Sequence, residues 1–469
     1  MTLSDATVRA QAATLKNRID QFLASPAYII AVMALAAISG IFGAEAFVYT
    51  LYTAVVVYAC FWGEDLLCLS PLFICCYIAP SRANNPGRNE ASVFAPGHGG
   101  IYMACLAALI VISLIYRVIR DRKRFCRKYT LLPGMLLLMA AYLLSGIGSN
   151  GYTAIAGKNL LFALAQSASV LIPYLLFCGG INWEKARKDY FPWIGFCVGS
   201  VLLLQLLWVY LTGDVVQGGV IERTQIYTGW GMYNNVGGLM TMTIPFAFYL
   251  ATRYRKGWVG IIVGSVYMAG ILLTCSRSSI LSSCAIYIVS MVLTLHYNGN
   301  RKDNTIAVIA VVGALSAVVL VFNRQFLVLF SDLLSKGLDP YGRDMIYARG
   351  LDQFKAFPVF GATFYPSDFR PWEWSTNPAF TGFFPPRWHN TIIQLMACCG
   401  SAGLLAYLFH RVQTLRLFLK QRSKEKNFIA CSLLVLLLCS LFDCHFFNIG
   451  PVLLYSTALA FAENCHTNK

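Results

Sequence analysis

The sequence predicts an all-α polytopic membrane protein, and its composition and apolar patterning both support that fold class. The 469 residues are 57% hydrophobic and 12% charged, with a mean hydropathy of +0.60. Soluble domains are about 25% charged, so an ordinary soluble protein is excluded. Backbone polar groups must be satisfied within a bilayer, and no strand-length alternation recurs in the chain. We therefore expect the membrane spans to be helices.

Apolar runs that approach membrane length recur along the chain. A helix needs about 20 apolar residues to cross the hydrocarbon core. We predict 12 to 14 transmembrane helices. Fourteen is the count if every run crosses the membrane, and twelve is the count if some of the short runs are re-entrant or interfacial. The runs lie near residues 27–43, 47–62, 66–79, 101–119, 131–146, 159–179, 190–211, 232–252, 257–275, 278–296, 305–322, 389–410, 427–443 and 446–462. We expect residues 1–469 to form a single integral membrane domain.

The distribution of the net charge of +16 predicts the topology. Lys and Arg are concentrated in every second connection between spans, as in cytoplasmic loops. The positions include Arg120, Arg124, Lys185, Lys188, Arg253, Arg255, Lys256, Arg301, Lys302, Arg411, Arg416 and Lys420. This pattern predicts cytoplasmic N- and C-termini and a large outward-facing loop at residues 323–388. It explains the charge better than nucleic-acid binding does, because the basic residues lie in short loops between apolar runs.

Residues 323–390 form the only long segment without an apolar run of membrane length. Asp339 is a candidate helix N-cap with Pro340 in the first helical position, so we expect a short helix to follow. At 3.6 residues per turn, one face of that helix combines Arg343, Tyr347, Gly350 and Phe354, and the other side carries Asp344, Asp352 and Lys355. Arg343 is therefore expected on the buried side. Residues 358–386 are predicted to form an aromatic lid or to anchor in lipid headgroups.

Several arginines are expected on the outward side, where basic residues near span ends are disfavoured. They are Arg223, Arg277, Arg343, Arg349 and Arg387. The planar guanidinium suits bidentate recognition of phosphate oxygens and keeps its charge when partly desolvated. We therefore predict an anionic ligand. The alternative is that the arginines cap helices or pair with carboxylates, which applies most to Arg349 and Arg387.

His389 begins a predicted span on the same side as these arginines. A neutral imidazole can take a proton from a hydroxyl, and a nearby guanidinium favours the neutral form. A lone histidine is more often structural, and His98 and His445 are expected on the same side as alternatives.

Metal catalysis is not expected. A Mg²⁺ or Mn²⁺ site needs suitably spaced carboxylates, and the outward loops offer only scattered ones. None of the 16 cysteines lies between residues 285 and 397. We expect neither a metal nor a cofactor, with the arginines acting as the electrophilic clamp on a leaving pyrophosphate.

Three dipeptides, in this order, resemble motifs of the O-antigen ligase and O-antigen polymerase superfamily. They are Ser276-Arg277 between two spans, Gly342-Arg343 opening a helix in the large loop, and His389-Asn390 where the next span begins. A weaker match is Arg223 followed by Asn235-Val236-Gly237-Gly238, with Asn234 where the family often has Pro. The resemblance covers roughly residues 220–450.

The resemblance implies a GT-C-like membrane enzyme of the bacterial inner membrane that moves a glycan from an undecaprenyl-pyrophosphate donor to an acceptor hydroxyl, with inversion and without a metal. His389 would be the base or would orient the acceptor, and Arg277 and Arg343 would hold the pyrophosphate. Substrate binding would involve Arg223, Asn235, Arg349, Arg387 and Asn390. The expected partners are the lipid-linked donor, a glycan or lipid-linked acceptor, and membrane lipids.

Other functions stay open at the sequence level. Ligases pass the glycan to an unlike acceptor such as lipid A core, polymerases pass it to another carrier-linked repeat unit, and a protein-glycosylating relative is a third branch. The competing class is a transporter or flippase, in which the arginines bind and move an anion. That class predicts ionisable residues near mid-membrane and repeat symmetry.

Overall fold

The computed structural model describes residues 3–75, 100–149, 152–213, 215–217, 220–228, 231–297, 301–321, 343–364, 388–420 and 422–465. Where the structure describes them, the predicted apolar runs fall mostly on helices, and residues 76–79 of one run lie outside the described residues. Among the described residues, five helices are long and apolar enough to cross a membrane, or six if the bent pair Ala13–Leu23 and Pro26–Gly40 is one span. These findings confirm the all-α polytopic membrane fold.

The chain divides into two compact units, each described here by itself. Unit 1 comprises Met1–Lys128 and Pro173–Val236, and unit 2 comprises Tyr129–Ile172 and Gly237–Lys469. The expectation of a single integral membrane domain stays a prediction.

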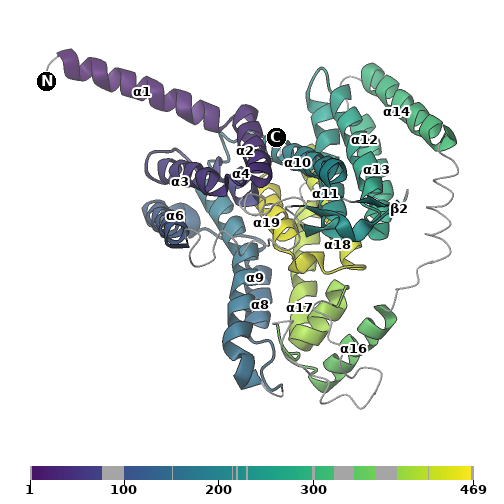
Figure 1. The fold of residues 1–469 in the computed structure, drawn as a ribbon. Coiled ribbons are helices and arrows are strands. Elements are labelled where there is room, and N and C mark those ends of the chain that lie inside the picture. The colour runs from purple at the N-terminus through teal and green to yellow at the C-terminus, as the bar shows by residue number, and fades with distance from the viewer. Residues whose placement is uncertain are drawn as a thin grey trace. The chain divides into compact units, whose positions relative to one another are not determined.

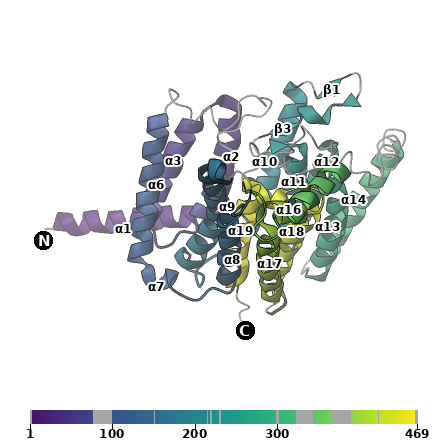
Figure 2. The same cartoon turned by 90° about the horizontal axis from the view of Figure 1, so that it is seen from below.

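Unit 1 is built from helices and two short hairpins. The helices are α1 (Leu3–Leu23), α2 (Pro26–Phe42), α3 (Glu45–Phe61), α4 (Leu69–Cys75), α6 (Gly100–Arg120), α7 (Arg122–Phe125), the end of α9 (Tyr152–Gly180) and α10 (Tyr190–Thr212). The hairpins pair β1 (Val216–Gln217) with β2 (Val220–Ile221), and β3 (Tyr227–Thr228) with β4 (Gly231–Met232). The 3-10 turn η1 (Arg223–Gln225) lies between the hairpins. Helices α3 and α6 pack side by side (Figure 2).

Unit 2 holds the remaining helices and most of the predicted site residues. They are α8 (Leu132–Leu143), the first part of α9, most of α11 (Tyr233–Arg253), α12 (Trp258–Leu273), α13 (Arg277–His296), α14 (Arg301–Val321), α16 (Arg343–Ala356), α17 (Thr391–Lys420), α18 (Lys424–Ser440), the 3-10 turn η4 (His445–Phe447) and α19 (Ile449–Asn464). Helix α12 lies beside α13 and α14, and α17 lies beside α16 and α18 (Figure 1).

Helix α11 forms the centre of unit 2, because its side chains from residue 239 to residue 251 are almost all fully buried. Polar side chains of three other helices bond to its backbone. Ser432 of α18 donates to the Met242 carbonyl at 2.6 Å, Thr294 of α13 to the Phe248 carbonyl at 3.3 Å, and Asn304 of α14 to the Ala251 carbonyl at 3.1 Å. In an apolar environment such bonds satisfy groups that would otherwise be costly to bury.

A kink in α17 is fixed by the chain that follows α16. Gly400 has φ 64° and ψ −158°, a conformation that is essentially restricted to glycine. Opposite it, the backbone of Ser401 donates to the Pro358 carbonyl at 2.8 Å, and Ala362 donates to the Ala397 carbonyl at 2.9 Å. The kinked helix and the segment after α16 therefore hold each other in one arrangement.

Arg411 differs from its sequence-based interpretation as a loop residue. Helix α17 continues to Lys420, so Arg411 lies inside it. Its guanidinium carbon is 4.6 Å, 4.8 Å and 5.0 Å from the ring centroids of Tyr407, Phe446 and Tyr455, and Nη1 donates to the Tyr455 hydroxyl at 3.0 Å. Cation–π contacts to three rings stabilise the charge there. Charge counting along the sequence could not detect these distant ring partners.

Candidate active site

His389 is held in an uncommon backbone conformation just before α17. Its φ of 49° is left-handed, which is rare outside glycine and costs conformational energy. The residues on both sides are fixed: the Trp388 amide donates to Gln394 Oε1 at 2.9 Å, and Asn390 Oδ1 accepts from the Ile392 amide at 2.9 Å as a helix cap. The hydroxyl of Tyr347 donates to the His389 carbonyl at 3.2 Å. The imidazole therefore projects from a constrained backbone.

The His389 ring faces the carboxylate of Asp443, with 3.3 Å between Nδ1 and Oδ1. Asp443 lies in the connection between α18 and η4 and is 8% exposed. Asn390 and Thr391 tie the start of α17 to that connection, because they donate to the carbonyls of Leu441 at 2.9 Å and Asp443 at 3.4 Å. The sequence analysis did not select Asp443, so this pairing is new.

Electrostatics keep the Asp443 carboxylate charged. Burial raises its pKa, but the hydrogen bond from His389 and the proximity of His445 lower it more, and the pKa lies well below its usual range. The Cys444 amide also donates to Oδ1 at 2.7 Å. A charged carboxylate at this position can hold the Nδ1–H tautomer of His389 and orient its ring.

His445 follows Asp443 by two residues and is 1% exposed. Among the described residues, neither of its ring nitrogens has a hydrogen-bond partner. Burial lowers its pKa, an effect that the Asp443 charge partly opposes. Two imidazoles thus interact with one carboxylate.

Arg343 reaches the same connection from the first residue of α16. Its Nη1 donates to the Phe442 carbonyl at 2.6 Å, one residue before Asp443. Tyr347, one turn later, donates a hydrogen bond to the His389 carbonyl. One face of α16 therefore contacts the backbone of His389 and the backbone next to Asp443. The structure therefore brings together Arg343, His389 and Asp443, of which the sequence analysis selected the first two.

Two glycines of α11 connect this cluster to the turn that carries Arg277. A Cβ on Gly238 would lie 2.8 Å from Cε1 of His445, and a Cβ on Gly237 would lie 2.7 Å from Oγ of Ser279. Ser279 Oγ is 2.9 Å from Oγ of Ser276, the residue before Arg277 at the start of α13. The Ser276-Arg277 turn and the connection carrying Asp443 therefore pack against adjacent positions of one helix, at distances that only glycine allows.

The buried face of α16 is turned slightly from the predicted one. Asp344 and Lys355 are exposed as expected, and Arg343 and Tyr347 are half-buried. Arg349, Gly350 and Gln353 are the buried residues, with Arg349 only 2% exposed. A Cβ on Gly350 would lie 2.5 Å from Cγ2 of Ile393, so α16 packs closely against the start of α17. Desolvation lowers the pKa of Arg349.

Two further predicted site residues, Arg223 and Asn235, belong to unit 1. The guanidinium carbon of Arg223 lies 5.3 Å from the ring centroid of Tyr233. Asn235 approaches Gly231, whose φ is 106° and where a Cβ would lie 2.8 Å from Asn235 Nδ2. These residues form a local cluster around the start of α11.

Other predicted features fall outside the described residues. They are Arg387, His98, the capping pair Asp339-Pro340, Gly342 and most of the segment 358–386.

Comparison with known proteins bears on the segment that carries this geometry. Residues 264–408 match a family model described as O-antigen ligase. This segment is therefore similar to O-antigen ligases. No curated protein and no solved structure matches the chain.

The matched segment contains Arg277, Arg343 and His389 and extends from α12 into α17. It confirms the resemblance found in the sequence and supports glycan transfer of the ligase or polymerase type between lipid-linked and acceptor molecules in a bacterial membrane. Asp443 and His445 lie beyond it. A sequence signal for them existed, since Phe442-Asp443-Cys444-His445 places two ionisable residues in a very short connection between apolar runs.

Proposed function

We propose that this protein is a membrane glycosyltransferase that moves an oligo- or polysaccharide from an undecaprenyl-pyrophosphate donor to an acceptor hydroxyl. The observation that carries the proposal is the 3.3 Å approach of His389 Nδ1 to the buried Asp443 carboxylate inside a cluster that includes Arg343. With the Nδ1 hydrogen directed at the carboxylate, Nε2 keeps its lone pair for a substrate proton. The O-antigen ligase match supports the reaction class.

In the proposed reaction, the acceptor oxygen attacks the anomeric carbon from the face opposite the pyrophosphate, so the configuration inverts. The acceptor proton passes to Nε2 of His389. The bond between the anomeric carbon and the pyrophosphate oxygen breaks, and its electron pair leaves with the diphosphate. Arg343 and Arg277 bind the diphosphate and compensate its growing charge, so the mechanism requires no metal.

The remaining residues have supporting roles in this proposal. Arg223, Asn235 and Arg387 contribute to substrate binding. Arg349 and Asn390 act through the frame of the site, since Arg349 is buried between helices and the Asn390 side chain is engaged with backbone groups of α17 and Leu441. Asp443 is a positioning residue for His389.

The proposed location follows from the charge distribution: the termini are cytoplasmic and the site faces outward. An outward site suits a carrier whose glycan is already on that side of the membrane. The acceptor is either an unlike molecule, as for a ligase, or another carrier-linked unit, as for a polymerase.

Transfer from a purified undecaprenyl-pyrophosphate glycan to candidate acceptors, with the purified protein, tests the proposal. We expect His389→Ala to lower the transfer rate by about 10²- to 10⁴-fold, the usual contribution of a general base. Arg343→Ala and Asp443→Asn are expected to lower it as well, because they remove a diphosphate ligand and the group that orients the base.

Matched controls separate this effect from loss of folding. His296→Ala changes an exposed histidine at the end of α13, and Arg122→Ala changes an exposed arginine in α7. Both are expected to transfer at the wild-type rate. Wild-type turnover by folded His389→Ala protein would refute the mechanism.

One observation bears on the transport alternative, since Arg411 is a half-buried ionisable side chain within a membrane-length helix. Such residues often mark transport pathways. Three aromatic rings surround the Arg411 guanidinium and Tyr455 accepts its hydrogen bond, which supports a structural role. Movement of a lipid-linked glycan across proteoliposomes without any glycosyl transfer would favour the transport alternative.

A further inference from the structure

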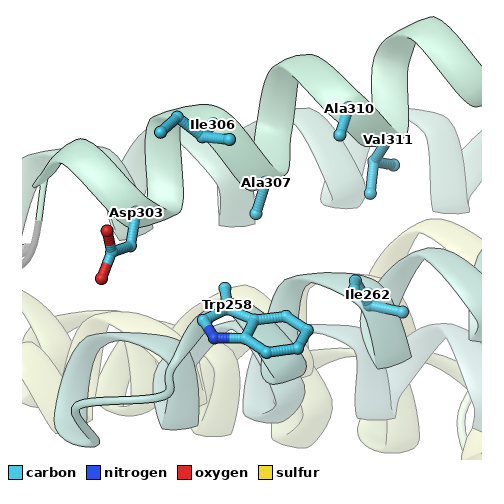
Figure 3. Close-up of a pocket in the computed structure, with 7 residues that line it drawn as sticks. All are labelled: Trp258, Ile262, Asp303, Ile306, Ala307, Ala310 and Val311. Carbon is cyan, nitrogen blue, oxygen red and sulfur yellow. The ribbon is translucent and has the colours of Figure 1, made fainter.

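Unit 2 contains an apolar crevice far from the candidate active site. It lies between α12 and α14, has a volume of about 520 Å³, and is lined by Trp258, Ile262, Asp303, Ile306, Ala307, Ala310 and Val311. Figure 3 shows Ala307 and Ala310 pointing from α14 toward α12, with Trp258 and Asp303 together at one end. Pockets for small ligands typically measure about 300–1,000 Å³, so the crevice is large enough for one.

The walls of the crevice match an acyl chain. Five of its seven lining side chains are aliphatic, and the neighbouring Ile309 is 66% exposed on the same helix. The small side chains of Ala307 and Ala310 leave the space open. In a protein with this many membrane-length apolar helices, such a surface faces hydrocarbon.

The end marked by Trp258 and Asp303 is basic. Exposed cations lie on the chain beside both residues: Arg253, Arg255 and Lys256 just before α12, and Lys302 at the start of α14. These four residues are called the basic rim. With Asp303 as the one acidic lining residue, the charge at this end is positive, and Trp258 and Tyr254 are 40% and 39% exposed beside it, as is typical of the membrane–water interface.

The crevice is separate from the proposed catalytic site. The 16 residues of α12 span about 24 Å, and the turn carrying Arg277 follows the opposite end of that helix. A carrier lipid whose pyrophosphate binds near Arg277 would therefore not place its headgroup at the basic rim.

We propose that the crevice between α12 and α14 binds a phospholipid with an anionic headgroup, one acyl chain lying along Ile262, Ile306 and Ala307 and the phosphate at the basic rim. Apolar burial supplies affinity for the chain. The cations supply preference for the headgroup, because each Lys or Arg near a lipid surface contributes about 1 kcal/mol of attraction to anionic lipid. The inference does not depend on the proposed function.

Native mass spectrometry of the delipidated protein in detergent tests the site. Phosphatidylglycerol is titrated against phosphatidylethanolamine with the same acyl chains. We expect the first molecule of phosphatidylglycerol to bind about tenfold more tightly than phosphatidylethanolamine. Glycerol phosphate, which lacks the chains, is expected not to compete.

Two pairs of variants assign this preference to the crevice. Ala307→Trp fills the crevice and is expected to abolish the tight site, whereas Ile309→Trp, on the exposed side of α14, is expected to keep it. Arg255→Gln with Lys256→Gln is expected to weaken phosphatidylglycerol binding at least about tenfold. The matched charge control, Arg122→Gln with Lys123→Gln in α7, is expected to leave it unchanged.

Equal binding of the two phospholipids by the wild-type protein would overturn the proposal, as would an undiminished preference for phosphatidylglycerol when Arg255 and Lys256 are both replaced by Gln. Competition by glycerol phosphate would overturn the role of the acyl chain. If Ala307→Trp does not fold, the exposed Arg255 and Lys256 pair still decides the question.

Discussion

At the scale of single residues, the histidine two positions after Asp443 is buried and poorly bonded. A buried polar group without partners costs about 1–3 kcal/mol. Both ring nitrogens of His445 are in this situation among the described residues. Its ring fills the space against Gly238 and lies close enough to lower the pKa of Asp443. His445 therefore fills the position between Gly238 and the chain that carries Asp443, the carboxylate that faces His389.

The lowered pKa of His445 predicts a pH-dependent stability. In the unfolded chain a histidine titrates near pH 6.5, whereas the folded protein resists protonation of His445 until a lower pH. Below about pH 6.5 the unfolded state therefore binds more protons than the folded state. This group then lowers the free energy of unfolding by at most about 1.4 kcal/mol per pH unit. We expect His445→Gln to reduce this loss, as measured by thermal unfolding in detergent between pH 8 and pH 5.

The exposed His296 supplies the control for that measurement. His296→Gln is expected to keep the wild-type dependence of melting temperature on pH. Because wild type and His445→Gln share every other histidine, the difference between these two proteins isolates His445. Identical slopes for wild type and His445→Gln would contradict the assignment.

At the scale of elements, the kink in α17 links the candidate site to the segment after α16. Gly361 has φ 70°, and a Cβ there would lie 2.2 Å from the Cys398 backbone carbon. A Cβ on Gly400 would lie 2.4 Å from the Val359 backbone carbon. Backbone-to-backbone packing at these two glycines sets how α16, with Arg343 at its start, lies against α17, which follows His389.

Gly400→Ala tests the importance of this packing. The substitution combines a backbone conformation that disfavours a side chain with a clash against immovable backbone atoms, so we expect a loss of about 3 kcal/mol or more. Gly157→Ala in α9 is the matched control, since no atom lies within 4 Å of its Cβ position and alanine favours a helix by about 0.5–1 kcal/mol. Thermal unfolding should show a lower midpoint for Gly400→Ala alone, and equal midpoints would contradict the packing argument.

Local sequence rules predicted α16 better than the kink. The periodicity of residues 343–356 placed Asp344 and Lys355 on the exposed side, because amphipathicity is encoded within a few turns. The kink at Gly400 depends on Val359 and Pro358, about 40 positions earlier in the sequence, so no local pattern indicates it.

At the scale of the whole molecule, the sequence predicted the fold class and part of the site for physical reasons that also explain the omissions. Membrane-length apolar runs are a local property, and their described parts are mostly helical. Dipeptide motifs identified Arg343 and His389. Asp443 was not selected because its meaning comes from a contact with His389, which lies more than 50 residues away.

The orientation of the site is the whole-molecule prediction on which the proposed donor depends. If basic connections are cytoplasmic, Lys355 in α16 faces outward and Arg122 in α7 faces the cytoplasm. Both positions are exposed, so a cysteine at either one can react with a membrane-impermeant maleimide. In a background where the exposed Cys105, Cys126 and Cys284 are serine, we expect Lys355→Cys to be labelled in intact spheroplasts and Arg122→Cys only after lysis.

The opposite result would have a definite meaning for the chemistry. Labelling of Arg122→Cys in intact spheroplasts, with protection of Lys355→Cys until lysis, would place Arg343 and His389 on the cytoplasmic side. The glycan of an outward-facing carrier could not reach them there, although the His389–Asp443 pair would be unchanged. A reversed pattern would therefore exclude a donor that is bound from the outward side, while leaving the acid–base role of His389 possible. The transfer assay with purified protein tests that role separately, because it does not depend on orientation in a membrane.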